Sequence, residues 1–124
     1  LPLTAAIARE LAGQVRVVNT LTLLSRDAYR WAEVYHRDCG KGAGVLLLAR
    51  AHGIPPGNIV AIGDNYNDLD LFAVARHAVA MGNAPADVRA AARRVAPPVA
   101  ESGAAVVLEE IAAGLWPAGG ERTA

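Results

Sequence analysis

The chain has almost no cysteine and no excess of charge of either sign. Cys39 is the single cysteine of 124 residues, which excludes an internal disulfide and favours a reducing compartment such as the cytoplasm. Twelve basic residues balance twelve acidic ones, so no overall field attracts nucleic acid or an anionic membrane surface. We find no apolar run long enough to cross a bilayer and no charged-then-apolar leader. We therefore predict a cytoplasmic protein without nucleic-acid or membrane partners.

An initiator methionine is also missing. The chain begins at Leu1-Pro2-Leu3 and enters a helical pattern at once. We interpret the sequence as a fragment of a longer protein. Its length is that of one domain and is sufficient to bury a core.

The first forty residues have a mixed pattern of helix and strand. Thr4 is expected to cap a helix over residues 5–12. Apolar residues near 15–18 and the alternation over 31–35 then predict two strands. We assign residues 1–39 to α+β material that is distinct from the rest of the chain.

From Gly40 onward, helices and short apolar strands alternate regularly. This order predicts βαβ units with right-handed crossovers, which make half of a doubly wound α/β sheet over residues 40–114. The Gly- and Pro-containing stretch 115–124 is expected to be a flexible tail. The predicted helices cover 43–52, 68–75, 85–93 and 104–113, and the predicted strands cover 59–62, 78–81 and 95–96.

The loop after the strand 59–62 concentrates oxygen ligands. Asp64 and Asp68 are four residues apart, and in open α/β sheets ligands bind at the carboxyl ends of the strands. Two carboxylates about 5 Å apart repel by roughly 3 kcal/mol at an effective dielectric of about 20. A bound Mg²⁺, which prefers oxygen ligands and keeps several waters, would turn this repulsion into attraction. The loop therefore predicts a magnesium site that also receives a phosphate.

A structural interpretation of the same loop stays open. Asp64 can simply end the strand, while Asn67 or Asp68 caps the following helix, as these residue types commonly do. From the loop alone, neither interpretation is preferred.

Several ordered motifs together resemble the carboxyl-terminal portion of haloacid dehalogenase superfamily phosphatases. Their order and spacing are closest to the Cof-like subgroup, which carries a large α/β cap. The resemblance implies the carboxyl-terminal half of a Rossmann-like three-layer core from residue 40 onward, preceded by a remnant of the cap in residues 1–39. The motifs are Gly40-Lys41-Gly42, Ala61 to Asp68, Ala80-Met81-Gly82-Asn83-Ala84 and Ser102-Gly103-Ala104.

The resemblance also implies roles for individual residues. Lys41 matches the lysine that neutralises the phosphoryl group, a role suited to a flexible ammonium. Asp64 matches a metal ligand, and Asp68 matches the second acid, which holds the metal's waters or the lysine. Asn67 matches the residue that donates its amide to the substrate phosphate, and Asn83 resembles a supporting position near the same site.

The nucleophile of that family has no counterpart here. It is the first aspartate of an Asp-x-Asp followed by Gly and a hydroxyl residue, whereas the only Asp-x-Asp is Asp68-Leu69-Asp70, inside the metal-binding motif. The resemblance implies a parent phosphatase that hydrolyses small phosphorylated metabolites, such as sugar phosphates, with Mg²⁺ and an aspartyl-phosphate intermediate. We predict that the 124 residues alone are inactive.

The sequence excludes two other kinds of ligand site and leaves one alternative function open. A helix-loop-helix calcium site is excluded because Leu69 stands where that loop needs glycine, and a phosphate loop at Lys41 is excluded because Tyr35 and Gly42 occupy its required positions. The alternative that remains is a non-enzymatic α/β module, flavodoxin-like or receiver-like, that binds a partner. Half a sheet also leaves a bare strand edge, which predicts possible self-association.

Overall fold

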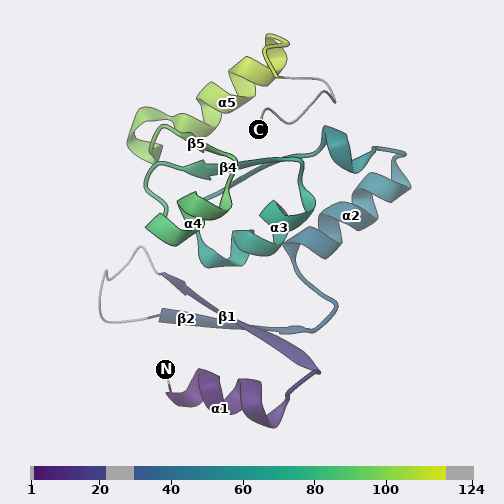
Figure 1. Ribbon diagram of the computed structural model, residues 1–124, viewed down its shortest axis with the longest axis vertical. Helices are drawn as coiled ribbons and strands as arrows, with labels where there is room; N and C mark the ends of the chain where they lie inside the picture. Colours follow the sequence, from purple (N-terminus) through teal and green to yellow (C-terminus); the bar gives the residue numbers. More distant parts are fainter. Residues whose placement is uncertain (1, 22–29, 117–124) are drawn as a thin grey trace.

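The computed structural model describes residues 2–21 and 30–116 and contains two sheets with five α-helices around them (Figure 1). Three 3-10 turns complete these described segments. The elements in chain order are α1 (Pro2–Glu10), β1 (Val15–Leu21), β2 (Arg30–His36), α2 (Lys41–Ala51), η1 (Pro56–Asn58), β3 (Val60–Gly63), η2 (Tyr66–Asp68), α3 (Leu69–Val74), β4 (His77–Met81), α4 (Ala86–Ala91), β5 (Arg94–Ala96), η3 (Val99–Glu101) and α5 (Gly103–Ala112).

The amino-terminal part is a helix packed on a β-hairpin. Strands β1 and β2 pair antiparallel from Val15 opposite His36 to Leu21 opposite Arg30. Helix α1 lies on the side of this hairpin that faces away from the second sheet (Figure 1). The prediction that Thr4 caps this helix was wrong: the helix begins at Pro2, and Thr4 is a buried residue inside it, only 5% exposed. Proline is well tolerated in the first turn of a helix, so the start lies earlier than the Thr4 signal indicated.

The second part is a three-layer α/β structure. Its parallel sheet has the order β3-β4-β5, with Val60 opposite His77 and Val79 opposite Arg94. Helices α2, α3 and α4 pack on one face, where Ala49, Phe72 and Val88 are buried in one cluster, and α5 packs on the other through Val107. Apolar residues on both faces of the strands explain why these strands read as continuous apolar runs.

Every helix and strand predicted from residue 40 onward is present, with ends shifted by at most two residues. The helix predicted over 85–93 ends two residues early, at Ala91. The backbone N–H of Arg93 instead donates to the carbonyl of Ala78, which starts the pairing of β5 with β4. Strand pairing therefore overrides a local sequence that favours helix.

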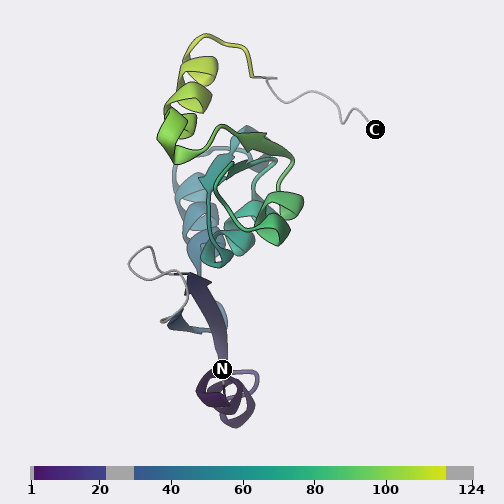
Figure 2. The same cartoon turned by 90° about the vertical axis from the view of Figure 1, so that its left-hand side faces the viewer.

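The two parts meet where the hairpin faces the turn η2. Figure 2 shows the hairpin beside the helices of the parallel sheet and α5 at the opposite end of the molecule. The division of the chain at residues 39 and 40 remains a prediction. The tail predicted over 115–124 lies outside the described residues from 117 onward; within the described part, Trp116 packs edge-on against the ring of His77, with ring centroids 5.6 Å apart. Over the described ranges, no helix is both long and apolar enough to cross a membrane.

Candidate functional site

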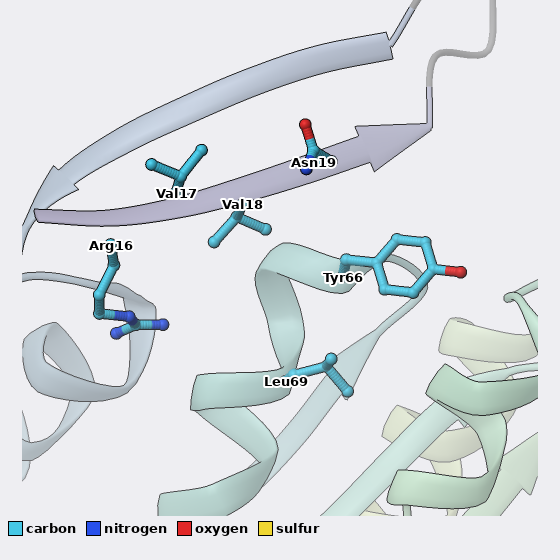
Figure 3. A pocket seen from close by; sticks show the side chains of 6 residues that line it. All are labelled: Arg16, Val17, Val18, Asn19, Tyr66 and Leu69. Atoms are coloured by element: carbon cyan, nitrogen blue, oxygen red, sulfur yellow. The ribbon is translucent and has the colours of Figure 1, made fainter. Parts of the chain in front are cut away.

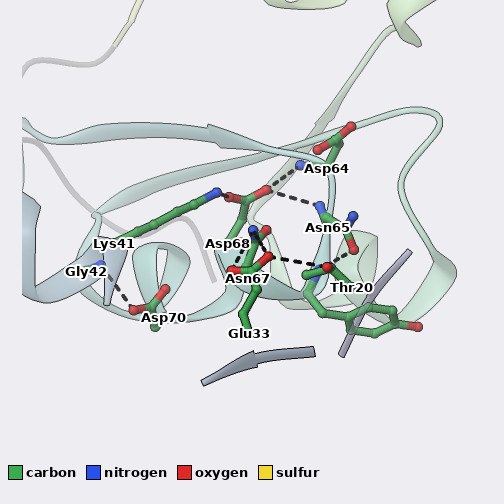
Figure 4. A network of polar contacts seen from close by, with 10 residues as sticks. Thr20, Glu33, Lys41, Gly42, Asp64, Asn65, Asn67, Asp68 and Asp70 are labelled. Atoms are coloured by element: carbon green, nitrogen blue, oxygen red, sulfur yellow. Dashed lines mark hydrogen bonds and ion pairs between the residues drawn. The ribbon is translucent and has the colours of Figure 1, made fainter. Parts of the chain in front are cut away.

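The carboxylate of Asp68 is the centre of the candidate site. Asp68 is 5% exposed, and its Oδ1 accepts a hydrogen bond from Lys41 Nζ at 2.5 Å. Its Oδ2 accepts from the backbone N–H groups of Asp64, at 2.8 Å, and Asn65, at 3.1 Å. Figure 4 shows these three donors converging on the one carboxylate. Such hydrogen bonds to an ionised acceptor are stronger than neutral ones and hold the lysine and the loop in a fixed relation.

The loop has a local reason for this geometry. Asn65 caps η2 and forms a capping box with Asp68. The expectation that Asn67 or Asp68 caps the following helix was wrong, because Asp68 stands at the N-cap position of α3 but its side chain makes no capping hydrogen bond to that helix. Gly63 makes room for the arrangement, because a Cβ at that position would lie 2.5 Å from Cβ of Asp68. The cap and the contact with Lys41 use the two different oxygens of Asp68, so the structural role and the predicted site role coexist.

Lys41 is the first residue of α2, and a second carboxylate holds that end of the helix. Oδ2 of Asp70 in α3 accepts from the N–H of Gly42 at 3.2 Å and from Arg16 Nη1 of β1 at 3.3 Å. A Cβ on Gly42 would lie 2.4 Å from the backbone oxygen of Asp70, so α2 and α3 approach closely only because this residue is glycine. Asp70 and Arg16 were not predicted as part of the site. The Asp-x-Asp spacing could have indicated that Asp70 belongs to the site. Arg16 lies in the other sheet, and nothing in its local sequence indicates a contact with the site.

Asp64 stands at the carboxyl end of β3 with an exposed side chain. Its carboxylate makes no hydrogen bond or ion pair with any residue that the structure describes. Over those same residues, no group of three His, Cys, Asp or Glu side chains is arranged to hold a metal ion. The carboxylates that could bind a cation are therefore Asp64 and Asp68. The oxygens of Asp68 already accept hydrogen bonds from N–H groups. This set fits Mg²⁺, which needs only one or two carboxylates besides water and phosphate oxygens.

Asn67 points toward the hairpin. Its Nδ2 donates to Glu33 of β2, at 3.0 Å from Oε1 and 3.4 Å from Oε2. Oε1 of Glu33 also accepts from the hydroxyl of Thr20 at 3.3 Å, and Figure 4 shows this chain of contacts beside the Lys41–Asp68 pair. Glu33 was not predicted as part of the site, because nothing in its own strand marks it as facing the loop.

Asn83 follows β4, one strand along the sheet. Its side chain is exposed, and its Oδ1 accepts from the backbone N–H of Val99 at 2.9 Å. This bond ties the turn after β4 to the turn after β5. Because parallel strands end at the same sheet edge, Asn83 lies at the edge that carries Asp64, with no hydrogen bond to the other predicted site residues.

A cleft of about 600 Å³ opens between the hairpin and the first turn of α3 (Figure 3). Its wall combines aliphatic side chains with an aromatic ring, an amide and a guanidinium. Tyr66 and Leu69 in that wall flank Asn67 and Asp68 in the sequence, so the cleft borders the candidate site. The lining residues are Arg16, Val17, Val18, Asn19, Tyr66 and Leu69.

Comparison with known proteins decides the family. The model of the haloacid dehalogenase-like hydrolases matches residues 6–108. The chain belongs to this family. Membership favours a hydrolase over the flavodoxin-like or receiver-like module, and the named relatives are phosphatases.

Three relatives illustrate the family likeness. The 5-amino-6-(5-phospho-D-ribitylamino)uracil phosphatase of Bacillus subtilis is 35% identical over 84 residues, which cover 68% of this chain and 29% of that protein. The phosphoglycolate phosphatase of Halorubrum lacusprofundi is 36% identical over 110 residues, covering 86% of this chain and 45% of the relative. A solved structure of a haloacid dehalogenase-like hydrolase from B. subtilis superposes with a TM-score of 0.73 at 27% identity, over 89% of this chain and 37% of that one. The chain thus spans less than half the length of these family members.

Proposed function

We propose that this chain supplies the lysine and metal side of a Mg²⁺-dependent phosphatase site that acts on small phosphorylated metabolites, such as sugar phosphates. The observation that carries the proposal is the contact between Lys41 Nζ and Asp68 Oδ1, next to the exposed carboxylate of Asp64. An ammonium, a free carboxylate and backbone donors at the carboxyl edge of a parallel sheet suit a phosphoryl group with its cation.

Each residue has a distinct part in the proposal. Lys41 neutralises negative charge on the phosphoryl oxygens, and Asp68 holds the ammonium in place for that purpose. Asp64 is the direct metal ligand, with Asp68 holding the metal's waters or the lysine. Asn67 donates an amide N–H to the phosphate, and Asn83 supports the same sheet edge. When bound, Mg²⁺ supplies positive charge that stabilises the phosphoryl group during transfer.

The attacking carboxylate is proposed to come from a part of the parent protein that this sequence does not contain. In that parent, phosphate transfer to an aspartate and hydrolysis of the aspartyl phosphate complete the reaction. The names of two relatives support the substrate class, since each refers to a small phosphorylated molecule. A cleft of about 600 Å³ has the size that such ligands occupy. The cytoplasm is the proposed compartment, in keeping with the free, exposed Cys39.

A titration of the ¹⁵N-labelled chain with Mg²⁺, with and without inorganic phosphate, tests the proposal. We expect the backbone amide signals of Asp64 and Asn67 to shift at millimolar Mg²⁺, and Asp64→Asn to abolish the shift. Glu101→Gln, which neutralises an exposed carboxylate in η3, serves as the control and should leave the shift unchanged. A loop that ignores both Mg²⁺ and phosphate would favour the second candidate, a partner-binding α/β module in which the acidic loop is structural.

A further inference from the structure

Among the hairpin residues that the structure describes, Glu33 is the one acidic side chain that reaches the candidate site. It is half-buried in β2 and accepts hydrogen bonds from two neutral donors, the hydroxyl of Thr20 and the amide of Asn67. No cation pairs with it among the residues that the structure describes. Thr20 is itself only 4% exposed, so one of the two donors to the carboxylate is a buried residue.

The chemistry of the two side chains fixes which end of the Asn67 amide faces the hairpin. An ionised carboxylate is an acceptor only, so it pairs with the NH₂ group of an amide and repels the amide oxygen. Both oxygens of Glu33 lie near Asn67 Nδ2, at 3.0 and 3.4 Å, and occupy one side of that nitrogen. An amide nitrogen carries two N–H donors, so one remains for a second acceptor.

We propose that Glu33 is a positioning residue of the phosphate site that acts through Asn67. It holds the NH₂ group in one orientation and leaves the second N–H directed to a phosphoryl oxygen. The inference rests on the proposed function, in which Asn67 binds the phosphate. It also makes the hairpin part of the site, because the phosphate donor is oriented only while β2 lies against η2.

A different role for the same contact predicts the opposite result. If the Glu33 carboxylate occupied the place of the phosphate, the two anions would compete for Asn67, and removing the carboxylate would tighten phosphate binding. A positioning role requires a side chain that is long enough to reach Asn67 and that carries an acceptor oxygen. Competition with phosphate, and repulsion between the two anions, depend on the negative charge of Glu33. Two substitutions separate these requirements. Glu33→Gln keeps the length and one acceptor oxygen but loses the charge, and Glu33→Asp keeps the charge but is one methylene shorter.

The experiment measures the affinity of the 124-residue chain for inorganic phosphate in the presence of Mg²⁺, followed at the side-chain NH₂ signals of Asn67. We expect Glu33→Asp and Glu33→Ala to weaken binding about three- to tenfold, the equivalent of one hydrogen bond. Glu33→Gln should stay within about twofold of the parent chain, since its carbonyl still accepts from Asn67. The matched controls are Glu10→Asp and Glu10→Gln on α1, where the carboxylate pairs with its neighbour Arg9.

Unchanged or tighter binding in Glu33→Asp overturns the inference, as does equal weakening in Glu33→Asp and Glu33→Gln. The NH₂ signals of Asn67 without phosphate provide a second, independent readout. Loss of orientation should bring its two proton signals closer together in Glu33→Asp and leave them separate in Glu33→Gln. If the parent chain binds no phosphate, the proposed function fails while these signals still decide whether Glu33 positions Asn67. If Glu33→Ala does not fold, the comparison of Glu33→Asp with Glu33→Gln still tests the inference.

Discussion

Lys41 and Asp68 are joined by a 2.5 Å contact between Nζ and Oδ1, although 27 residues separate them in the chain. The side chain of Lys41 is 46% exposed, whereas the side chain of Asp68 is 7% exposed. The pair therefore has one end fixed in the protein and one end open to solvent. This asymmetry suits the role proposed for Lys41, which is to meet an incoming anion while Asp68 stays in place.

The buried end of that pair should matter for folding as well as for the site. Asp68→Ala removes the acceptor of three donors, two of them backbone N–H groups of the loop. We expect the free energy of unfolding to fall by about 2 kcal/mol, because a buried carboxylate that accepts from three donors is lost. Chemical denaturation measures the change. Asp64→Asn, at an exposed position in the same loop, should change stability by less than about 0.5 kcal/mol; equal effects would show that burial of Asp68 is not the cause.

Gly63 should be intolerant of even one added methyl group. Gly63→Ala places a Cβ 2.5 Å from Cβ of Asp68 and 2.6 Å from its Oδ2, so the loop must shift. We expect a destabilisation of about 1–3 kcal/mol, the usual range for overpacking, measured by thermal or chemical unfolding. The Lys41–Asp68 contact should be disturbed at the same time.

Gly44 provides the matched control for this substitution. A Cβ at that position in α2 meets nothing within 4 Å, and alanine is the better helix former. Gly44→Ala should therefore stabilise the chain by about 0.5–1 kcal/mol. Similar losses in both variants would mean that the chain tolerates no alanine substitution at all, which would contradict the explanation based on close approach.

The 124 residues alone should not hydrolyse a generic phosphate ester in the presence of Mg²⁺. The lysine and the predicted metal ligands are present, but the only Asp-x-Asp has Asp68 bonded to Lys41 and Asp70 bonded to the start of α2. Neither carboxylate is free to attack phosphorus. Release of inorganic phosphate, compared with a Lys41→Met variant, measures this. Robust turnover that Lys41→Met abolishes would show that the chain contains a nucleophile that we have misplaced.

The ion pair between Arg94 and Glu110 should make stability depend on acid pH. The hydrogen bond from Arg94 holds the pKa of Glu110 below its ordinary value of 4.5, and the guanidinium also stacks 5.3 Å from the ring of Trp116. A carboxyl group with a lowered pKa in the folded state stabilises the protein above its unfolded pKa, and this contribution is lost as the pH falls through the folded pKa.

Thermal unfolding between pH 7 and pH 3 checks the sign. Glu110→Gln should be less stable than the parent chain near neutral pH, and the difference should shrink below about pH 4.5. Glu109→Gln, at the exposed neighbouring position on α5, should show no such pH-dependent difference. A gap between Glu110→Gln and the parent that stays constant down to pH 3 would contradict the role of this ion pair.

The elements from residue 40 onward could be predicted because local signals agree with the fold there. Short apolar strands alternate with helices, and Gly63 marks the strand end where Asp64 and Asp68 follow. The structural and the functional interpretation of the loop could not be separated from the sequence. An aspartate in a capping box and an aspartate that holds a lysine are the same residue type. Asp68 does both with different oxygens.

The contacts between the two sheets could not be predicted from the sequence. Glu33 and Arg16 sit in the hairpin, and their partners Asn67 and Asp70 lie 34 and 54 residues away. Such pairs depend on how the hairpin docks against η2 and α3, which no local periodicity encodes. Thr4 is a similar case, because it is buried inside α1, and α1 contacts strand β1 of the hairpin.

The open edge of the parallel sheet leads to a last prediction, that the isolated chain self-associates. Strand β3 ends the order β3-β4-β5, so within the described part of the chain one side of β3 has no neighbouring strand. Beside it, a groove of about 260 Å³ is lined by Val45, Leu48, Ala49 and Ile54 among others, and Leu47 and Leu48 are 70% and 61% exposed. An unpaired strand next to apolar side chains favours pairing with a second copy.

Sedimentation velocity over a range of concentrations measures this association. Leu48→Glu places a charge in the groove beside β3 and should shift the chain toward monomer, since an edge charge opposes strand pairing. Leu108→Glu is the matched control, because Leu108 is similarly exposed, at 59%, but lies on α5, which packs on the opposite face of the sheet. Equal loss of association in both variants would indicate nonspecific apolar contact, and a parent chain that is monomeric at all concentrations would show that the edge of β3 is protected without a second copy.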